Sequence, residues 1–232
     1  MTQRNRRRQR RHGGIGAKLL PVLGGVFALL AIATIAVASW VLDVAADAPS
    51  LSSCKPIDRG GNTVLYAADG SKLGMVRSPE VRSLVSIERV PKTLQLATVA
   101  IEDQRFYEHE GLDFTGIARA ALKDLEAGEV VEGASTITQQ LVRNLCIPNP
   151  KRTLERKIEE AQLAVEYAER HSRKEILGSY LNVASYGTVE GSTAVGVGAA
   201  SQIFFSKPVW KLKLPEAALL AGLPQAPSEY NP

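Results

Sequence analysis

Cysteine, tryptophan and methionine are scarce in this chain of 232 residues, with two of each. Two cysteines cannot hold together a disulfide-rich miniprotein, and a chain of this length can bury a sizeable core without such bridges. Hydrophobic residues make up 45% of the sequence and charged residues 22%, which excludes disordered and collagen-like chains. We find no internal repeat. The composition therefore predicts one globular domain of moderate size, with room for an appended segment.

Acidic residues are absent from the first 18 positions, which hold seven bases. These bases are Arg4, Arg6, Arg7, Arg8, Arg10, Arg11 and Lys18. The formal net charge of +4 therefore averages two unlike parts, because the rest of the chain has more acids than bases. A basic globular domain that binds nucleic acid is not expected, and we predict no nucleic-acid partner. Residues 1–18 are predicted to be a basic cytoplasmic stub.

Charge of either sign is absent from Leu19 to Leu42. About 20 apolar residues cross the core of a bilayer, and Trp40 stands where an interfacial aromatic residue is common. A cleavable signal peptide is the alternative, but its apolar stretch is normally only ~7–15 residues, and no small-x-small cleavage site directly follows Leu42. We predict an uncleaved anchor over residues 19–42. The positive-inside rule then predicts a single-pass plasma-membrane protein with its N-terminus in the cytoplasm and everything after Asp43 outside.

Both cysteines, Cys54 and Cys146, fall in the part predicted to be exported. An oxidising compartment permits a disulfide, but the sequence leaves open whether the two residues approach each other. Leu51–Cys54 also has a weak likeness to a lipidation box, although acidic residues separate it from the apolar run. Both ideas stay open at this point.

The part predicted to be exported should contain a linker, then a hairpin and then helices. Residues 43–61 are rich in Pro, Ser, Gly and Asp and are predicted to be a linker. A β-hairpin is expected over Thr63–Ala67 and Lys72–Val76, with its turn at Asp69-Gly70. From Pro91 onward the pattern predicts helices to the end of the chain. These are expected over Thr93–Arg105, Asp113–Ala127, Thr136–Leu145, Arg152–Ser172, Lys174–Val183 and Pro215–Gly222.

The first candidate site is the pair Glu102-Asp103 at the end of an apolar helix. Acids near a helix C-terminus oppose the macrodipole, so the placement is locally unfavourable. A carboxylate held against apolar surroundings has a raised pKa, which suits general acid–base chemistry. A structural ion pair of Glu102 with Arg105 or Arg119 explains the spacing equally well.

The second candidate site lies on the helix predicted over Arg152–Ser172, whose residues divide into three arcs at ~100° per residue. One arc is predicted to be the core stripe, and it holds Leu154, Ile158, Ala161, Val165 and Ala168. Most glutamates form a solvated arc. Glu160 stands apart from them, on a partly apolar third arc beside Arg156 and Lys157. Two helical salt bridges, each of which contributes little to stability, would explain this arc. A site for phosphate or pyrophosphate would explain it as well.

The third candidate site is the polar run Gly133–Gln140. Thr136 and Gln139 have the spacing of a capping box at the start of a helix. Capping accounts for one hydroxyl and one amide, but not for Ser135, Thr138 and Gln140 as well. A dense run of neutral donors and acceptors suits a sugar or a phosphate.

Together these stretches resemble the peptidoglycan glycosyltransferase domain (glycosyltransferase family 51) of class A penicillin-binding proteins. Five motifs of that family have counterparts in order over residues 62–232. They are Glu102-Asp103-x-x-Phe106-x-x-His109-x-Gly111, Gly133–Gln140, Arg156-Lys157-x-x-Glu160, Lys174-x-Ile176-Leu177-x-x-Tyr180-Leu181-Asn182 and Ala221–Ser228. The chain departs from the usual pattern at Ala134, at Gly178 and at Ser185-Tyr186-Gly187. No set of transpeptidase motifs follows, so the resemblance implies a monofunctional form or a fragment of a longer protein.

The resemblance implies a mainly α fold with a lysozyme-like large lobe and a smaller, membrane-apposed lobe near residues 113–135. It implies polymerisation of lipid II into glycan strands by inverting transfer, with release of undecaprenyl pyrophosphate. Glu102 would be the general base and Glu160 a second catalytic carboxylate, which either holds a divalent metal (Mg or Mn) on the pyrophosphate or positions the cations. No organic cofactor is implied. The expected partners are lipid II, the growing strand, the bilayer and cell-wall synthesis proteins.

The positions that match the family's motifs imply further substrate-binding residues. They are Asp103, Ser135, Thr136, Gln139, Gln140, Arg152, Arg156, Lys157 and Asn182. Asp103 and His109 fit better as structural supports of the first motif. Two other classes stay open: a lysozyme-like muramidase that uses a glutamate as general acid, and a catalytically silent membrane-bound scaffold. The basic pair beside Glu160 argues against both.

Overall fold

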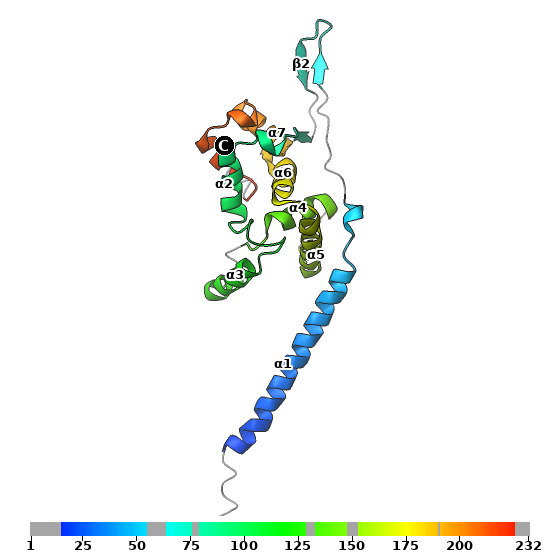
Figure 1. Ribbon diagram of the computed structural model, residues 1–232, viewed down its shortest axis with the longest axis vertical. Coiled ribbons are helices and arrows are strands. Elements are labelled where there is room, and N and C mark those ends of the chain that lie inside the picture. Colours follow the sequence, from blue (N-terminus) through cyan, green and yellow to red (C-terminus); the bar gives the residue numbers. More distant parts are fainter. Residues whose placement is uncertain are drawn as a thin grey trace, which may run out of the picture. The chain divides into compact units, whose positions relative to one another are not determined.

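The computed structural model describes residues 15–54, 64–75, 79–128, 133–147, 153–189 and 191–225. The chain divides into two compact units, Met1–Asp47 and Ala48–Pro232 (Figure 1). The first unit contains one long helix, and the second contains the helices and strands that carry the five motifs. We describe each unit by itself.

The first unit is the helix α1 (Ile15–Ala46). Its stretch Pro21–Ala46 has a mean hydropathy of 2.4 and is long and apolar enough to cross a bilayer. Large apolar side chains along it, such as Phe27 and Leu30, are exposed. Such a surface suits lipid rather than water. The helix contains the predicted span 19–42 and continues into the predicted linker, part of which (55–61) lies outside the described residues.

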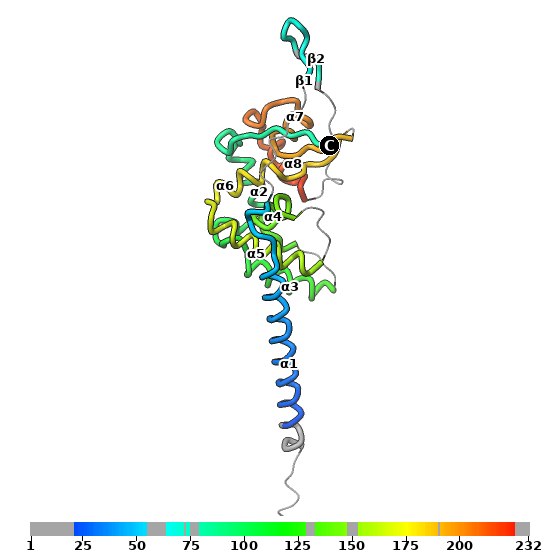
Figure 2. The backbone as a smooth tube through the Cα atoms, turned by 90° about the vertical axis from the view of Figure 1, so that its right-hand side faces the viewer, coloured from blue at the N-terminus to red at the C-terminus, as the bar shows by residue number. Residues whose placement is uncertain are grey.

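Helices make up most of the second unit, as predicted. They are α2 (Lys92–Glu102), α3 (Phe114–Ala127), α4 (Ile137–Cys146), α5 (Leu154–Arg170), α6 (Arg173–Val183), α7 (Val197–Phe205) and α8 (Leu214–Gly222). Short 3-10 turns lie at Leu51–Ser53, Ile87–Arg89 and Val209–Lys211. Among the helices of the second unit, α3 lies at one end in both views and α7 towards the other (Figures 1 and 2).

The core forms where α2 packs against α8 and where α4 packs against α5 and α6. Its centre is fully buried and consists mainly of leucine, isoleucine and tyrosine side chains, among them Leu94, Leu141, Leu181 and Tyr180. Side-chain caps fix the helix starts. Thr136 and Gln139 form the predicted capping box of α4, and Asp113 accepts a hydrogen bond from the Gly116 N–H at the start of α3.

The predicted hairpin is present. Strands β1 (Val64–Tyr66) and β2 (Lys72–Met75) pair antiparallel, and Asp69 accepts hydrogen bonds from Ser71 in the turn. Gly70 has φ +80°, a conformation that glycine adopts without a steric penalty. Thr63 and Val76, the outer ends of the prediction, lie outside the described residues.

The prediction of helices alone after Pro91 was wrong for residues 185–195. They form β4 (Ser185–Val189) and β5 (Ser192–Val195), which are antiparallel, and β3 (Glu80–Arg82) pairs with β5 in parallel. Helix α7, which follows, was also not predicted. Asn182 ties this sheet to α6, because its side-chain amide bonds both the N–H and the C=O of Val85.

The core stripe predicted on α5 was wrong as well. Leu154 is 71% exposed, and the buried residues of the helix are Glu160, Leu163 and Ala164. The arc that carries Glu160 therefore faces the interior, where it packs against α4. The pairing of Glu160 with two cations makes this arc compatible with burial.

A disulfide joins Cys54 to Cys146, which answers the question that the sequence left open. Leu51 and Cys54 pack against the small cluster formed by Val142, Leu163 and Ala164. The segment after α1 is therefore held against α4 and α5. No free thiol occurs among the described cysteines, so Cys54 is not available for lipidation in this form.

Candidate active site

A cleft of about 350 Å³ opens between the end of α2, one face of α3 and the segment that leads into α4. Glu102 and Arg105 line it from the first motif, and Ser135 lines it from the second. Arg119 and Lys123, one turn apart on α3, add two cations. The lining thus combines the carboxylates of Glu102, Asp103 and Asp113 with three cations, and the cations suit a phosphorylated substrate.

Glu102 is the last residue of α2 and is half-buried. Its Oε2 accepts a hydrogen bond of 2.8 Å from Nε2 of Gln140, whereas its buried Oε1 has no hydrogen-bond partner among the described residues. Burial raises the pKa of Glu102, and the neighbouring Asp103 adds to this, while Gln140 and Arg143 oppose it. A carboxylate with a raised pKa and one oxygen without a hydrogen-bond partner is suited to proton transfer.

The structural alternative for Glu102, an ion pair with Arg105, is not what the site contains. Arg105 instead pairs with Glu108 at 3.0 Å and lies 3.6 Å from Asp113. Arg119 lines the same cleft as Glu102. Glu102 therefore lines the cleft without an ion pair to Arg105.

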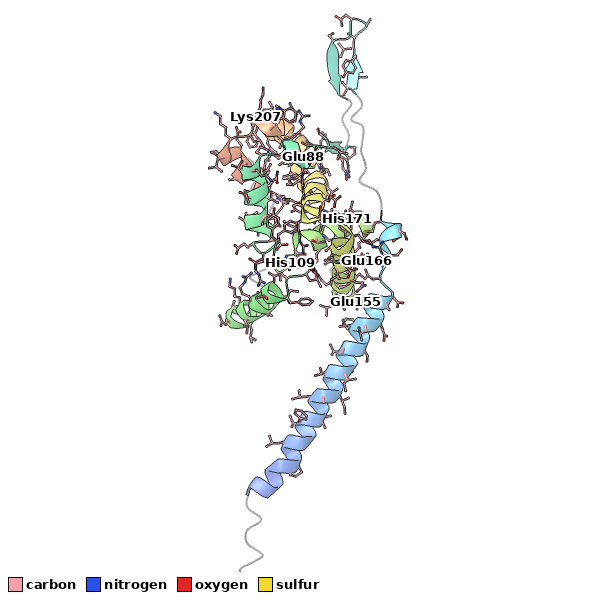
Figure 3. All side chains as sticks on the ribbon, in the orientation of Figure 1. Glu88, His109, Glu155, Glu166, His171 and Lys207 are labelled. Carbon is pink, nitrogen blue, oxygen red and sulfur yellow. A yellow bond between two sulfur atoms is a disulfide. The ribbon has the colours of Figure 1, made fainter. Side chains whose placement is uncertain are left out.

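Asp103 holds the first motif to the second. Its carboxylate lies 2.9 Å from Nε2 of His109 and accepts a 3.0 Å hydrogen bond from the Ile137 N–H at the start of α4. His109, which Figure 3 labels, is buried in the loop between α2 and α3. Gly111 ends this loop at φ +90°, where a Cβ would lie 2.5 Å from the Ala164 carbonyl oxygen. Asp103 and His109 therefore connect the first motif to the start of α4.

Glu160 is fully buried and carries two cations. One oxygen binds Arg156, and the other lies 3.1 Å from Nζ of Lys157. Nζ of Lys157 also donates a 2.6 Å hydrogen bond to Oγ of Ser135, which lines the cleft. This lysine links the third motif to the wall of the cleft. A buried carboxylate that fixes two cations beside a cleft prepares a binding place for an anion.

Comparison with known proteins decides the family. The family model described as Transglycosylase matches residues 69–232. The chain belongs to the transglycosylase family. It is 43% identical over 208 residues to penicillin-binding protein 2D of Bacillus subtilis (strain 168), which covers 90% of this chain and 28% of that protein.

Two further relatives agree. Penicillin-binding protein 1A of Aquifex aeolicus (strain VF5) is 46% identical over 72% of this chain and 22% of its own length. Penicillin-binding protein 1A of Escherichia coli (strain K12) is 42% identical over 79% of this chain and 21% of its own length. The chain thus spans about a quarter of the length of the relatives that it matches.

The other residues predicted to bind substrate are placed differently in this transglycosylase domain. Thr136 and Gln139 are buried and use their side chains in the capping box, and the Thr136 hydroxyl donates to the Gly111 carbonyl. Gln140 binds Glu102. The Asn182 amide is engaged by Val85 and by the Gly178 carbonyl. Of these four residues only Thr136 lines the cleft, and Arg152 lies outside the described residues.

Sequence reasoning missed two features of the transglycosylase cleft. Arg119 was considered only as an ion-pair partner, and Lys123 was not considered, although their i, i+4 spacing puts both on one face of α3. It named Tyr180 and Tyr186 but did not place them near Glu102. Burial raises the pKa of both phenols, and the charge of Glu102 raises it further. No local pattern connects these tyrosines with Glu102.

Proposed function

We propose that this chain polymerises lipid II into peptidoglycan glycan strands by inverting glycosyl transfer and releases undecaprenyl pyrophosphate. The observation that carries the proposal is the arrangement of opposite charges around one cleft: Glu102 has a free oxygen, and Lys157 reaches the same cleft through Ser135. Membership of the transglycosylase family supports the same reaction.

The proposed reaction uses Glu102 as the general base. Glu102 takes the proton from the 4-hydroxyl of the acceptor sugar, and the resulting oxygen forms a bond to the anomeric carbon of the growing chain. The bond from that carbon to the pyrophosphate oxygen breaks, and its electron pair leaves with the pyrophosphate. Attack on the face opposite the leaving group turns an α-linked pyrophosphate into a β-1,4 bond.

The cations of the third motif are assigned to the leaving group. Arg156 and Lys157 would stabilise the negative charge that develops on the pyrophosphate, and preorganised charges of this kind act most strongly where water is excluded. Arg119 and Lys123 also line the cleft, where they would contact a second phosphorylated substrate. The reaction needs no nucleotide, because the pyrophosphate is the leaving group.

The residues around Glu160 fit the positioning role better than the metal-binding role. Both of its oxygens already face cations, and no group of three or more His, Cys, Asp or Glu side chains that could hold a metal occurs among the described residues. Divalent metals prefer several oxygen ligands. We therefore derive no step through a metal held by Glu160.

A membrane location fits a substrate with a polyprenyl tail. Helix α1 is assigned as the anchor, with the N-terminus in the cytoplasm and the second unit outside. In the second unit α3 exposes a row of large apolar side chains, including Phe114, Leu122 and Leu125. Such a helix face suits contact with a bilayer. Tethering the enzyme and both substrates to one membrane increases their encounter.

The proposal is tested by polymerising lipid II with the purified, detergent-solubilised chain. The wild type is compared with Glu102→Gln and with Glu110→Gln, which alters an exposed carboxyl in the same motif. Long glycan strands are expected from the wild type and Glu110→Gln, but not from Glu102→Gln. Wild-type product from Glu102→Gln would contradict the base assignment. Shortening of preformed strands would instead indicate a muramidase, and a folded but inert wild type would indicate a scaffold.

A further inference from the structure

Two buried tyrosines lie beside Glu102, but only one of them contacts the partner of this glutamate. The hydroxyl of Tyr180 on α6 donates a 3.4 Å hydrogen bond to Oε1 of Gln140 on α4. Nε2 of the same Gln140 donates the 2.8 Å bond to Oε2 of Glu102 at the end of α2. Side chains from three helices thus form a hydrogen-bonded row that ends on the carboxylate.

The side-chain amide of Gln140 has two unlike ends, and only one of them stabilises an ionised carboxylate. With the NH2 group toward Glu102, the amide donates to the charged form. If the amide turned over, its carbonyl oxygen would face the carboxylate, which is unfavourable unless Glu102 is protonated. The hydroxyl of Tyr180, which donates to Oε1, adds to the preference for the productive orientation.

Two charged residues near Glu102 affect its ionisation directly, and the two tyrosines near it are neutral. Arg143 on α4 favours the ionised form of Glu102, and Asp103 opposes it. Tyr180 and Tyr186 are both 1% exposed. Burial raises the pKa of each phenol, and the charge of Glu102 raises it further. Tyr180 consequently stays protonated and remains a donor at any pH at which the enzyme would work.

We propose that Tyr180 is a positioning residue of the glycosyltransferase site. It supports the Gln140 amide with its NH2 group toward Oε2 of Glu102, which keeps the carboxylate ionised until it accepts the proton of the sugar hydroxyl. This inference rests on the proposed function. It adds that a residue of α6, a helix that does not line the cleft, influences the protonation of Glu102.

The test is the pH dependence of kcat/KM for lipid II polymerisation by the full chain in detergent. The variants are Tyr180→Phe and, as a matched control, Tyr186→Phe, which removes a buried hydroxyl near Glu102 outside the row. In Tyr180→Phe the acid limb should move to higher pH by roughly 0.5–1 unit, because a hydrogen bond to the ionised form is weakened. Its kcat should fall more than its KM changes. Tyr186→Phe should keep the wild-type midpoint.

A second variant isolates the route through Gln140. Gln140→Met removes the amide and should shift the acid limb at least as far as Tyr180→Phe does. In that background Tyr180→Phe should add no further shift, because the tyrosine acts only through the amide. The midpoint of the limb does not depend on the fraction of folded enzyme, so partial misfolding does not obscure the result.

Three experimental outcomes would overturn the inference. An unchanged midpoint in Tyr180→Phe, an equal shift in Tyr186→Phe, or additive shifts with Gln140→Met would each show that Tyr180 does not position the base. If Glu102→Gln is inactive while one of these outcomes occurs, the proposed function stands and only this inference fails. If Glu102→Gln is fully active, the base assignment fails first.

Discussion

The surroundings of Glu102 and of Glu160 show how partners decide what a buried carboxylate can do. Glu102, at the end of α2, is half-buried and bound by a neutral amide, and one oxygen remains without a partner. Glu160, on α5, is fully buried and bound by two cations. An amide leaves the charge available for proton transfer, whereas two cations neutralise it. The first glutamate is therefore suited to chemistry and the second to holding charges in place.

The largest effect is expected when the chemical carboxylate is removed. Glu102→Gln keeps the shape of the side chain but cannot accept a proton, so polymerisation should fall by about 10²–10⁴-fold, as for other general bases. The free energy of unfolding should not decrease, because no ion pair is lost. Initial rates with lipid II and denaturant unfolding measure the two quantities. If Glu102→Gln were less stable than the wild type, both glutamates would have a structural role, and the contrast drawn between them would be wrong.

The matching change at the second glutamate should act mainly on stability. Glu160→Gln leaves Arg156 and Lys157 without their buried counter-charge, so the free energy of unfolding should fall by roughly 3–5 kcal/mol. Denaturant titration measures this loss. Glu169→Gln, at an exposed position of the same helix, should unfold like the wild type. Wild-type stability of Glu160→Gln would contradict the structural role assigned to it.

Lys157 connects the two regions and should show a mixed effect. Lys157→Met removes the cation between Glu160 and Ser135, and kcat should fall by about 10²–10³-fold, as when one donor to a developing anion is lost. The loss of stability should be smaller than in Glu160→Gln, because Arg156 still pairs with the glutamate. Steady-state kinetics beside thermal unfolding separate the two effects. A loss of stability without a loss of kcat would remove Lys157 from the proposed leaving-group site.

The smallest effect is a pH dependence of stability at Glu102. Its pKa is higher in the folded than in the unfolded chain, so the folded state binds more protons between the two pKa values. Stability should therefore fall as the pH rises from the unfolded pKa, ~4.3, through the folded one, and Glu102→Gln should lack this component. The difference in unfolding free energy between the two proteins, followed against pH, measures it. A difference that does not vary with pH would contradict the raised pKa.

Local signals in the sequence predicted the parts of the fold that depend on neighbours along the chain. The capping box of Thr136 and Gln139, the turn at Asp69-Gly70 and most helices were predicted in place. The separation of Glu160 from the solvated glutamates was visible on the helical wheel. Which arc faces the interior was not, because periodicity defines faces but does not say which one a neighbouring helix covers.

Features that depend on distant residues were not predictable. The Cys54–Cys146 bond spans 92 positions, and no local pattern indicates it. Strands β4 and β5 are short and rich in serine and threonine, so their alternation is weak. The Gln140–Tyr180 contact joins α4 to α6 across 40 positions. Such contacts come from packing, which a single sequence does not display.

The disulfide adds a second covalent connection between the segment after α1 and helix α4. From the end of α1 at Ala46 the chain soon reaches Cys54, and the disulfide leads from there to Cys146, the last residue of α4, without passing through the hairpin, α2 or α3. A pull applied to α1 would thus reach α4 directly. Near the opposite end of that helix, Gln140 binds Glu102. Tension on the N-terminal helix would be resisted by the most deeply packed helix of the unit, while the first motif remains outside the path of the force.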